Sequence, residues 1–262
     1  DKISTGKKTD KFGIEINKVN QLLIKFRELK NINLKGLSCH VGSQINNLKI
    51  FEKVFKTMKE VTNFFISNNI PIQHVDLGGG FPVNYDKDSV DMNISQIGEL
   101  ANLMFRNMPY EISYEPGRYL VAKSGKIITK IMTTKNNGGI NYLITDAGMQ
   151  TLIRPAMYAS YHRIDSMNII DKKKIKYTIA GPICETGDTL AKNIFLPEQK
   201  LGDYLIIHDT GAYGAVMASN YNSRGIPAEI LVHKNQFATI REEEEILEIA
   251  KKDIIPDWIK SY

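Results

Sequence analysis

The first 120 residues alternate between two apolar patterns, one with helical spacing and one made of short continuous runs. An apolar residue every three or four positions predicts an amphipathic helix, and a short apolar run that ends at glycine or proline predicts a buried strand. The helical pattern covers residues 16–29, 51–65 and 97–104. The strand pattern covers residues 36–41, 74–77 and 110–114. Strand and helix in alternation predict parallel strands joined by crossover helices.

Polar and glycine-rich segments come directly after the predicted strands, at residues 40–44, 78–82 and 115–118. Open α/β sheets and (β/α) barrels carry their functional residues at the carboxyl ends of the strands. We therefore expect one site where the ends of the three strands meet.

After Tyr119 the pattern changes to short β-rich runs separated by turn signals such as Asn136-Asn137-Gly138-Gly139. The runs cover residues 119–122, 126–133, 142–145, 176–180, 204–208 and 228–232. They predict a second, antiparallel domain over residues 121–262, closed by an acidic helix near residues 241–251. Residues 1–120 form the first domain in this interpretation.

Composition and charge narrow the class of protein. Hydrophobic residues make up 42% of the 262-residue chain, which favours a packed core over disorder. The 34 basic and 29 acidic residues give a net charge of +5, which suits anionic small molecules, and there is no concentrated basic stripe of the kind that binds nucleic acid. The densest basic run consists of Lys172, Lys173, Lys174 and Lys176, which we interpret as the solvated end of a hairpin.

The two cysteines, Cys39 and Cys184, are too few for a disulfide framework and favour a cytoplasmic location. No apolar run approaches the roughly 18 residues of a membrane span. No secretion signal opens the chain, and because the first residue is Asp1, we expect the sequence to begin inside something longer or after processing.

Two motifs follow strands and are weak when taken alone. Gly78, Gly79 and Gly80 allow backbone N–H groups to approach a phosphate, although a plain tight turn also explains them. Glu115 is able to pair with a protonated ring nitrogen, and Arg118 to form a fork on a carboxylate or phosphate. Gly117 between them permits close approach, and a surface turn with a salt bridge is the alternative for this motif.

The remaining candidates are of several kinds. At the end of the first strand, His40 is either a ring that stacks on a planar cofactor or a core histidine, Ser43 is a phosphate ligand, and Cys39 is a small apolar filler. In the β-rich part, Cys184 is a candidate proton donor, and the carboxylates of Glu185 and Asp188 are candidate ligands of an ammonium group. Their spacing does not predict a metal site. Arg154, Tyr158 and Tyr213 offer a guanidinium and two phenols, which as isolated motifs are more often structural.

The order of the motifs is more specific than any one of them. The chain carries, in this order, CHVGSQ, LGGGFP, EPGR, RPAMY, GPICETGD and GAYGAVMASNYNSRGIPAEILV. In this order they resemble the alanine-racemase-like decarboxylases that use pyridoxal 5'-phosphate, and within that group the diaminopimelate decarboxylases. The resemblance runs from about Ile3 to about Val232. It implies the C-terminal part of a (β/α)8 cofactor-binding barrel followed by an antiparallel β-rich domain.

The resemblance also implies a role for each motif residue. It places Ser43, Gly78, Gly79, Gly80 and Arg118 around the cofactor phosphate, Glu115 at the pyridine nitrogen and His40 against the ring. It makes Cys184 the proton donor, and it places Cys184 and Glu185 at the cofactor of a partner subunit, so the implied site needs a homodimer. The implied substrate contacts come from Arg118, Arg154, Tyr158, Glu185 and Tyr213, with Tyr213 also against the cofactor.

The substrate follows from the charges that it presents. Meso-2,6-diaminopimelate still carries a carboxylate and an ammonium at its far end when the other end reacts. Arg154, with Arg118, suits that carboxylate, and Glu185 suits the ammonium, whereas ornithine has no distal carboxylate to bind. The resemblance therefore favours conversion of diaminopimelate to L-lysine and CO₂, as a step of lysine biosynthesis.

One part of the family pattern is missing. The family attaches its cofactor through a lysine after an early barrel strand, well upstream of CHVGSQ. Eight lysines precede His40 in this chain, and none stands in a matching strand-ending context. Three strands also cannot close an eight-stranded barrel. We expect either a fragment of an enzyme or a split or truncated gene product that is inactive alone. The alternatives are a non-catalytic remnant, a decarboxylase of ornithine, arginine or carboxynorspermidine, and an unrelated sugar-phosphate barrel.

Overall fold

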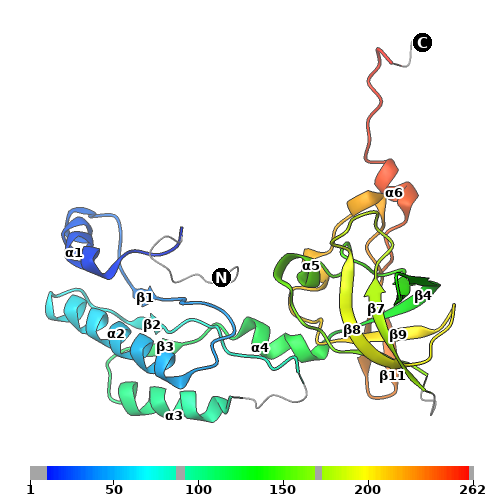
Figure 1. The fold of residues 1–262 in the computed structure, drawn as a ribbon. Coiled ribbons are helices and arrows are strands. Elements are labelled where there is room, and N and C mark those ends of the chain that lie inside the picture. Colours follow the sequence, from blue (N-terminus) through cyan, green and yellow to red (C-terminus); the bar gives the residue numbers. More distant parts are fainter. Residues whose placement is uncertain (1–10, 87–91, 169–172, 260–262) are drawn as a thin grey trace. The chain divides into compact units, whose positions relative to one another are not determined.

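The protein is seen here in a computed structural model that describes residues 11–86, 92–168 and 173–259. It divides into two compact units, Asp1–Val121 and Ala122–Tyr262 (Figure 1). Each unit has a hydrophobic core of its own.

The first unit is built on three short parallel strands, as the sequence predicts. They are β1 (Gly36–Ser38), β2 (His74–Asp76) and β3 (Glu111–Ser113), in the order β1-β2-β3. Gly36 pairs with His74, and His74 with Glu111, so the three strands start at the same level of the sheet. The loops that follow them therefore leave from the same edge.

Helices alternate with these strands. A 3-10 turn η1 (Ile16–Lys18) leads into α1 (Val19–Glu28), and the longer helices are α2 (Leu48–Ser67) and α3 (Ile94–Phe105). Asn47 and Asn93 cap α2 and α3, each accepting a hydrogen bond at 3.0 Å from a backbone N–H of the first turn. The apolar stripe of α2 buries Phe55 and Phe65 completely, and α2 and α3 pack against each other (Figure 1).

One predicted strand of this region is wrong. Residues 117–121 form the short helix α4 (Gly117–Val121), followed by a 3-10 turn η2 (Ala122–Ser124). Pro116 precedes the helix, and its carbonyl accepts the N–H of Leu120 at 3.1 Å, which closes the first turn. The apolar run that suggested a strand instead gives a helix on which Leu120 is 68% exposed.

The second unit contains a six-stranded sheet in the order β6-β9-β4-β5-β7-β8 and a two-stranded ribbon. The pairs are antiparallel as predicted, except that β5 and β7 run parallel. The sheet strands are β4 (Lys126–Asn137), β5 (Ile140–Thr145), β6 (Ile164–Ser166), β7 (Lys174–Ala180), β8 (Thr189–Pro197) and β9 (Tyr204–His208). The ribbon strands are β10 (Glu229–His233) and β11 (Gln236–Arg241).

The sequence pattern missed strands β6, β8 and β11 and the helix α5 (Arg154–Tyr158). In β8 the alternation is interrupted at Asn193, which adopts a left-handed φ of 60°. The predicted acidic helix is shorter than expected, because β11 extends to Arg241 and the helix α6 covers only Ile246–Ala250. The remaining short helical turns are η3 (Ala215–Met217) and η4 (Tyr221–Ser223).

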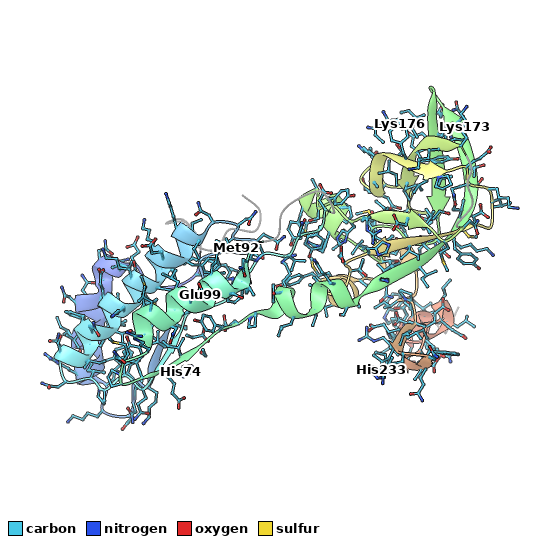
Figure 2. The ribbon with its side chains drawn as sticks, turned by 90° about the horizontal axis from the view of Figure 1, so that it is seen from below. His74, Met92, Glu99, Lys173, Lys176 and His233 are labelled. Atoms are coloured by element: carbon cyan, nitrogen blue, oxygen red, sulfur yellow. The ribbon has the colours of Figure 1, made fainter. Side chains whose placement is uncertain are left out.

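The basic run lies at the start of β7, where Lys173 and Lys176 are exposed and lie near each other (Figure 2). Lys172 lies outside the described residues. Among the helices that the structure describes, none is long and apolar enough to cross a bilayer.

Candidate functional site

The glycine motif after β2 brings three loops of the first unit into contact. A Cβ atom on Gly78 would lie 2.1 Å from the carbonyl oxygen of Cys39, after β1. A Cβ on Gly79 would lie 2.1 Å from the carbonyl oxygen of Glu115, after β3. A Cβ on Gly80 would lie 2.4 Å from the carbonyl oxygen of Gly42, and Gly80 has a φ of +86°. Only glycines allow the loops to approach this closely.

The amide groups of the three glycines differ in what they bind. Gly78 donates its N–H to Asp76 Oδ1 at 2.7 Å, and Gly79 donates to His40 Nδ1 at 3.4 Å. The N–H of Gly80 has no acceptor among the described residues, and Gly80 is also the least buried of the three. The amide of Gly80 is therefore the one that suits an anion, while the amide of Gly79 joins the loop after β1 and that of Gly78 binds Asp76 at the end of its own strand.

The segment that follows the glycines is held from two sides. Phe81 stacks on Phe51 of α2, with ring centroids 5.7 Å apart. Gln44 exchanges two hydrogen bonds with the backbone of Val83, at 2.7 and 2.8 Å. This pair joins the loop after β1 to the loop after β2, a role of Gln44 that no pattern in the sequence predicts.

Arg118 and Ser43 meet at the same edge of the sheet. Arg118 donates through Nε to Ser43 Oγ at 3.2 Å and through Nη1 to the phenol oxygen of Tyr85 at 3.1 Å. Ser43 comes from the loop after β1, Tyr85 from the segment after the glycines, and Arg118 from α4. A guanidinium next to a hydroxyl provides donors for a phosphate oxygen. Tyr85 is a member of this cluster that the sequence did not single out.

His40 and Glu115 lie on either side of Gly79. His40 Nδ1 is 4.0 Å from Glu115 Oε2, and both side chains are exposed. An exposed carboxylate and an exposed imidazole therefore lie next to each other at this edge of the sheet. Gly117 differs from the other motif glycines, because nothing lies within 4 Å of the position of its Cβ. The local backbone at position 117 therefore has room for a side chain.

Cys39 has the environment of a structural thiol. Burial, with smaller effects from the carboxylates of Asp76 and Glu115, raises the pKa of Cys39 to about 11. Its side chain packs against the core of the first unit, as expected for an apolar filler.

In the second unit, Arg154 begins helix α5 and is 5% exposed. Its Nη1 lies 2.8 Å from Nε2 of His162, which is itself 1% exposed. Tyr158 ends the same helix, four positions later, and is half-buried, so both side chains lie on one face. His162 was not predicted, since a single histidine in an irregular segment carries no pattern.

Cys184 and Glu185 lie in an exposed turn between β7 and β8. The side-chain amide of Asn222 donates to Cys184 Sγ at 3.4 Å. Asn222 and Ser223 both adopt a left-handed φ, of 56° and 54°. Tyr213 has a left-handed φ of 59° as well, and is 45% exposed in the turn before η3. A left-handed backbone conformation costs free energy in residues other than glycine, and such residues often occur at functional sites.

Asp188 does not fit the ammonium-binding role that its motif suggested. It is 4% exposed and accepts the N–H of Met149 at 2.6 Å and that of Ile183 at 2.7 Å. Gly148 and Gly181 lie so close that a Cβ on either would fall about 2.5 Å or less from Asp188 Oδ1. Burial raises the pKa of Asp188, while these two hydrogen bonds and Arg224 act in the opposite direction. Asp188 therefore fastens two loops together, and only Glu185 remains exposed.

The structure thus brings together the predicted residues of the first unit, which are His40, Ser43, Gly78, Gly79, Gly80, Glu115 and Arg118. Those of the second unit fall into three places: Arg154 and Tyr158 in α5, Cys184 and Glu185 in the turn between β7 and β8, and Tyr213 in the turn before η3. No group of three or more His, Cys, Asp or Glu side chains arranged for a metal ion occurs in the described part of the chain.

A family model matches the first part of the chain, and curated relatives match nearly all of it. Residues 1–122 match the family described as "Pyridoxal-dependent decarboxylase, pyridoxal binding domain". The diaminopimelate decarboxylase of Pseudomonas fluorescens is 36% identical over 256 residues, which is 97% of this chain and 61% of that protein. The chain thus spans about three fifths of the length of this curated relative.

Solved structures give the same picture. The diaminopimelate decarboxylase of M. jannaschii, in a co-complex with L-lysine, superposes with a TM-score of 0.92 at 33% identity, covering 98% of this chain and 61% of that one. A lysine/ornithine decarboxylase of Vibrio vulnificus, complexed with cadaverine, superposes with a TM-score of 0.74 at 28% identity, covering 81% of this chain and 57% of that one.

Proposed function

Because the chain belongs to the pyridoxal-dependent decarboxylases, with diaminopimelate decarboxylases among its relatives, we propose that it is part of an enzyme that converts meso-2,6-diaminopimelate to L-lysine and CO₂. The observation that carries the cofactor half of the proposal is the contact between Arg118 and Ser43, beside the glycines that join three strand ends.

The cofactor is pyridoxal 5'-phosphate, which supplies a ring that accepts electrons when the bond from Cα to the carboxylate breaks. In our proposal Arg118, Ser43 and the N–H of Gly80 bind its phosphate. Glu115 holds the proton on the ring nitrogen, and His40 lies against the ring face. The residues fit this group, because an anion-binding end and a ring-binding end stand at one sheet edge within the first unit.

The second unit supplies the substrate contacts in this proposal. Arg154 binds the distal carboxylate, and Tyr158 and Tyr213 donate hydrogen bonds. Glu185 binds the distal ammonium, and Cys184 delivers the proton to the carbon that loses CO₂. We further propose that Cys184 and Glu185 act on a partner subunit in a homodimer in the cytoplasm, as the family resemblance implies.

We also propose that the isolated chain is inactive. The described lysines before His40 lie in helical or irregular segments, with Lys18, for example, paired to Glu15 at 3.1 Å. Lys35 precedes a strand and does not follow one. Without a lysine at a strand end, the first unit is expected to hold the cofactor only through its phosphate.

The test is release of CO₂ from meso-diaminopimelate and, separately, from ornithine, with added cofactor. The isolated chain should release none from either. A complete protein that carries this chain together with a lysine-bearing segment should act on diaminopimelate. Turnover by the isolated chain would show that the lysine had been misplaced. Preference for ornithine in the complete protein would support the decarboxylase of another substrate, and absence of any turnover would support the remnant.

A further inference from the structure

The side chain of Arg154 has a neighbour whose role the proposed function does not explain. His162 lies in the segment between α5 and β6, and both side chains are buried. Nη1 of Arg154 and Nε2 of His162 are 2.8 Å apart. Two groups that often carry positive charge are unusual partners at this distance, so the protonation of the imidazole decides what the contact does.

The partners of His162 define its tautomer. An arginine guanidinium only donates hydrogen bonds, so Nε2 of His162 must accept. Nδ1 lies 3.0 Å from the backbone carbonyl of His208, which only accepts, so Nδ1 must donate. Both contacts are satisfied at once by the neutral imidazole with its proton on Nδ1. A second proton on Nε2 would point at Arg154.

The acceptor of His162 belongs to a rigid element. His208 ends β9, pairs with Lys126 of β4, and donates its N–H to the carbonyl of Arg163 at 2.9 Å. The imidazole is thus attached to the sheet on one side and to the guanidinium on the other.

We propose that His162 is a positioning residue that holds the guanidinium of Arg154 in the orientation needed for an amino-acid substrate with a second carboxylate. This rests on the proposed function. The neutral imidazole accepts a hydrogen bond without cancelling the positive charge, so Arg154 keeps the charge that a carboxylate recognises. A carboxylate at position 162 would bind Arg154 more strongly and would compete with the substrate.

Two substitutions of His162 distinguish a role of its hydrogen bonds in positioning Arg154 from a role of its volume in packing. His162→Gln retains both groups, because its amide oxygen accepts from Arg154 and its NH₂ donates to His208. His162→Leu fills a similar volume with an apolar side chain and removes both the acceptor and the donor. His233→Leu replaces an exposed histidine of β10 and serves as the control.

The first measurement is nuclear magnetic resonance of ¹⁵N-labelled isolated chain. We expect His162 to show a protonated Nδ1 and an unprotonated Nε2, and Arg154→Met to shift the Nε2 signal. The Arg154 guanidinium protons should exchange with water at least about tenfold faster in His162→Leu, and near the normal rate in His162→Gln and His233→Leu. A protonated Nε2, or unchanged exchange in His162→Leu, would overturn the proposal. The tautomer and His162→Gln decide the matter if His162→Leu does not fold.

The second measurement is steady-state kinetics of the complete protein with meso-diaminopimelate. His162→Leu should raise KM about tenfold with a smaller change in kcat, and His162→Gln should recover most of the loss. A fall in kcat as large as the rise in KM, in both variants, would contradict a positioning role. If the protein decarboxylates no dicarboxylate, the proposed function fails, and the resonance measurement still decides the role of His162.

Discussion

In the first unit the charged motif residues stand at strand ends with their side chains at least partly exposed, as His40, Glu115 and Arg118 do. In the second unit two comparable residues, Arg154 and Asp188, are buried. Both carboxylate oxygens of Asp188 accept hydrogen bonds from backbone N–H groups, and the guanidinium of Arg154 contacts the imidazole of His162. Asp188 is therefore part of the framework, whereas Arg154 is a buried guanidinium that a histidine contacts, so burial alone does not separate a framework charge from one that meets a ligand.

The largest expected effect is the difference in alkylation between the two cysteines, one in each unit. At pH 8, with the pKa of Cys39 at about 11, roughly one Cys39 thiol in a thousand is ionised, and the thiolate is the reactive form. Iodoacetamide should therefore add one label per chain, on the exposed Cys184. Raising the pH towards 11 should add a second label on Cys39. Mass spectrometry of peptides locates the labels, and fast labelling of Cys39 at pH 8 would mean that the loop after β1 is open.

Gly79→Ala should give the next largest effect. Its Cβ would lie 2.1 Å from the carbonyl oxygen of Glu115, so the loops after β2 and β3 must separate. We expect the free energy of unfolding to fall by roughly 3 kcal/mol in urea titrations, as for severe overpacking. Gly117→Ala is the matched control, because its Cβ meets nothing within 4 Å, and it should be close to neutral. Equal effects would remove the argument that the glycines join the loops.

The sequence predicts the elements whose apolar periodicity is regular and the polar segments that follow the strands. The stripes of α2 and α3 and the three strand ends could be predicted, because parallel strands bring their carboxyl ends to one edge. The contacts of Gln44, Tyr85 and His162 could not, because each depends on which loop lies opposite. The run at residues 119–122 was misjudged as a strand, because its apolar residues outweighed the helix-starting signal of Pro116.

Asp188→Ala should have a smaller but clear effect on the second unit. It leaves the N–H groups of Met149 and Ile183 without their acceptor, and we expect a loss of about 2 kcal/mol in the free energy of unfolding. Glu185→Ala, three positions earlier on the exposed turn, should change it by less than about 0.5 kcal/mol. If Glu185→Ala were the more damaging variant in urea titrations, the assignment of framework and surface roles in this motif would be reversed.

The smallest expected effect concerns His208. Burial, and then the charge of Arg163, lower the pKa of His208 below its ordinary value of 6.5. The unfolded chain then binds a proton before the folded one does, so stability is full above pH 6.5 and falls as the pH drops through the lowered pKa. Thermal unfolding should show a smaller loss on acidification in His208→Gln than in the natural protein. An identical loss would mean that other groups dominate.

The most direct test of the central claim uses pyridoxine 5'-phosphate, which carries the ring and phosphate of the cofactor but lacks the aldehyde that reacts with lysines. Titrated into ¹⁵N-labelled chain, it should shift the backbone signals of Ser43, Gly80 and Glu115. Arg118→Met should weaken binding about tenfold, whereas Arg106→Met, on the exposed end of α3, should not. Shifts confined to other parts of the chain, or equal binding by both variants, would contradict a cofactor site at the strand ends.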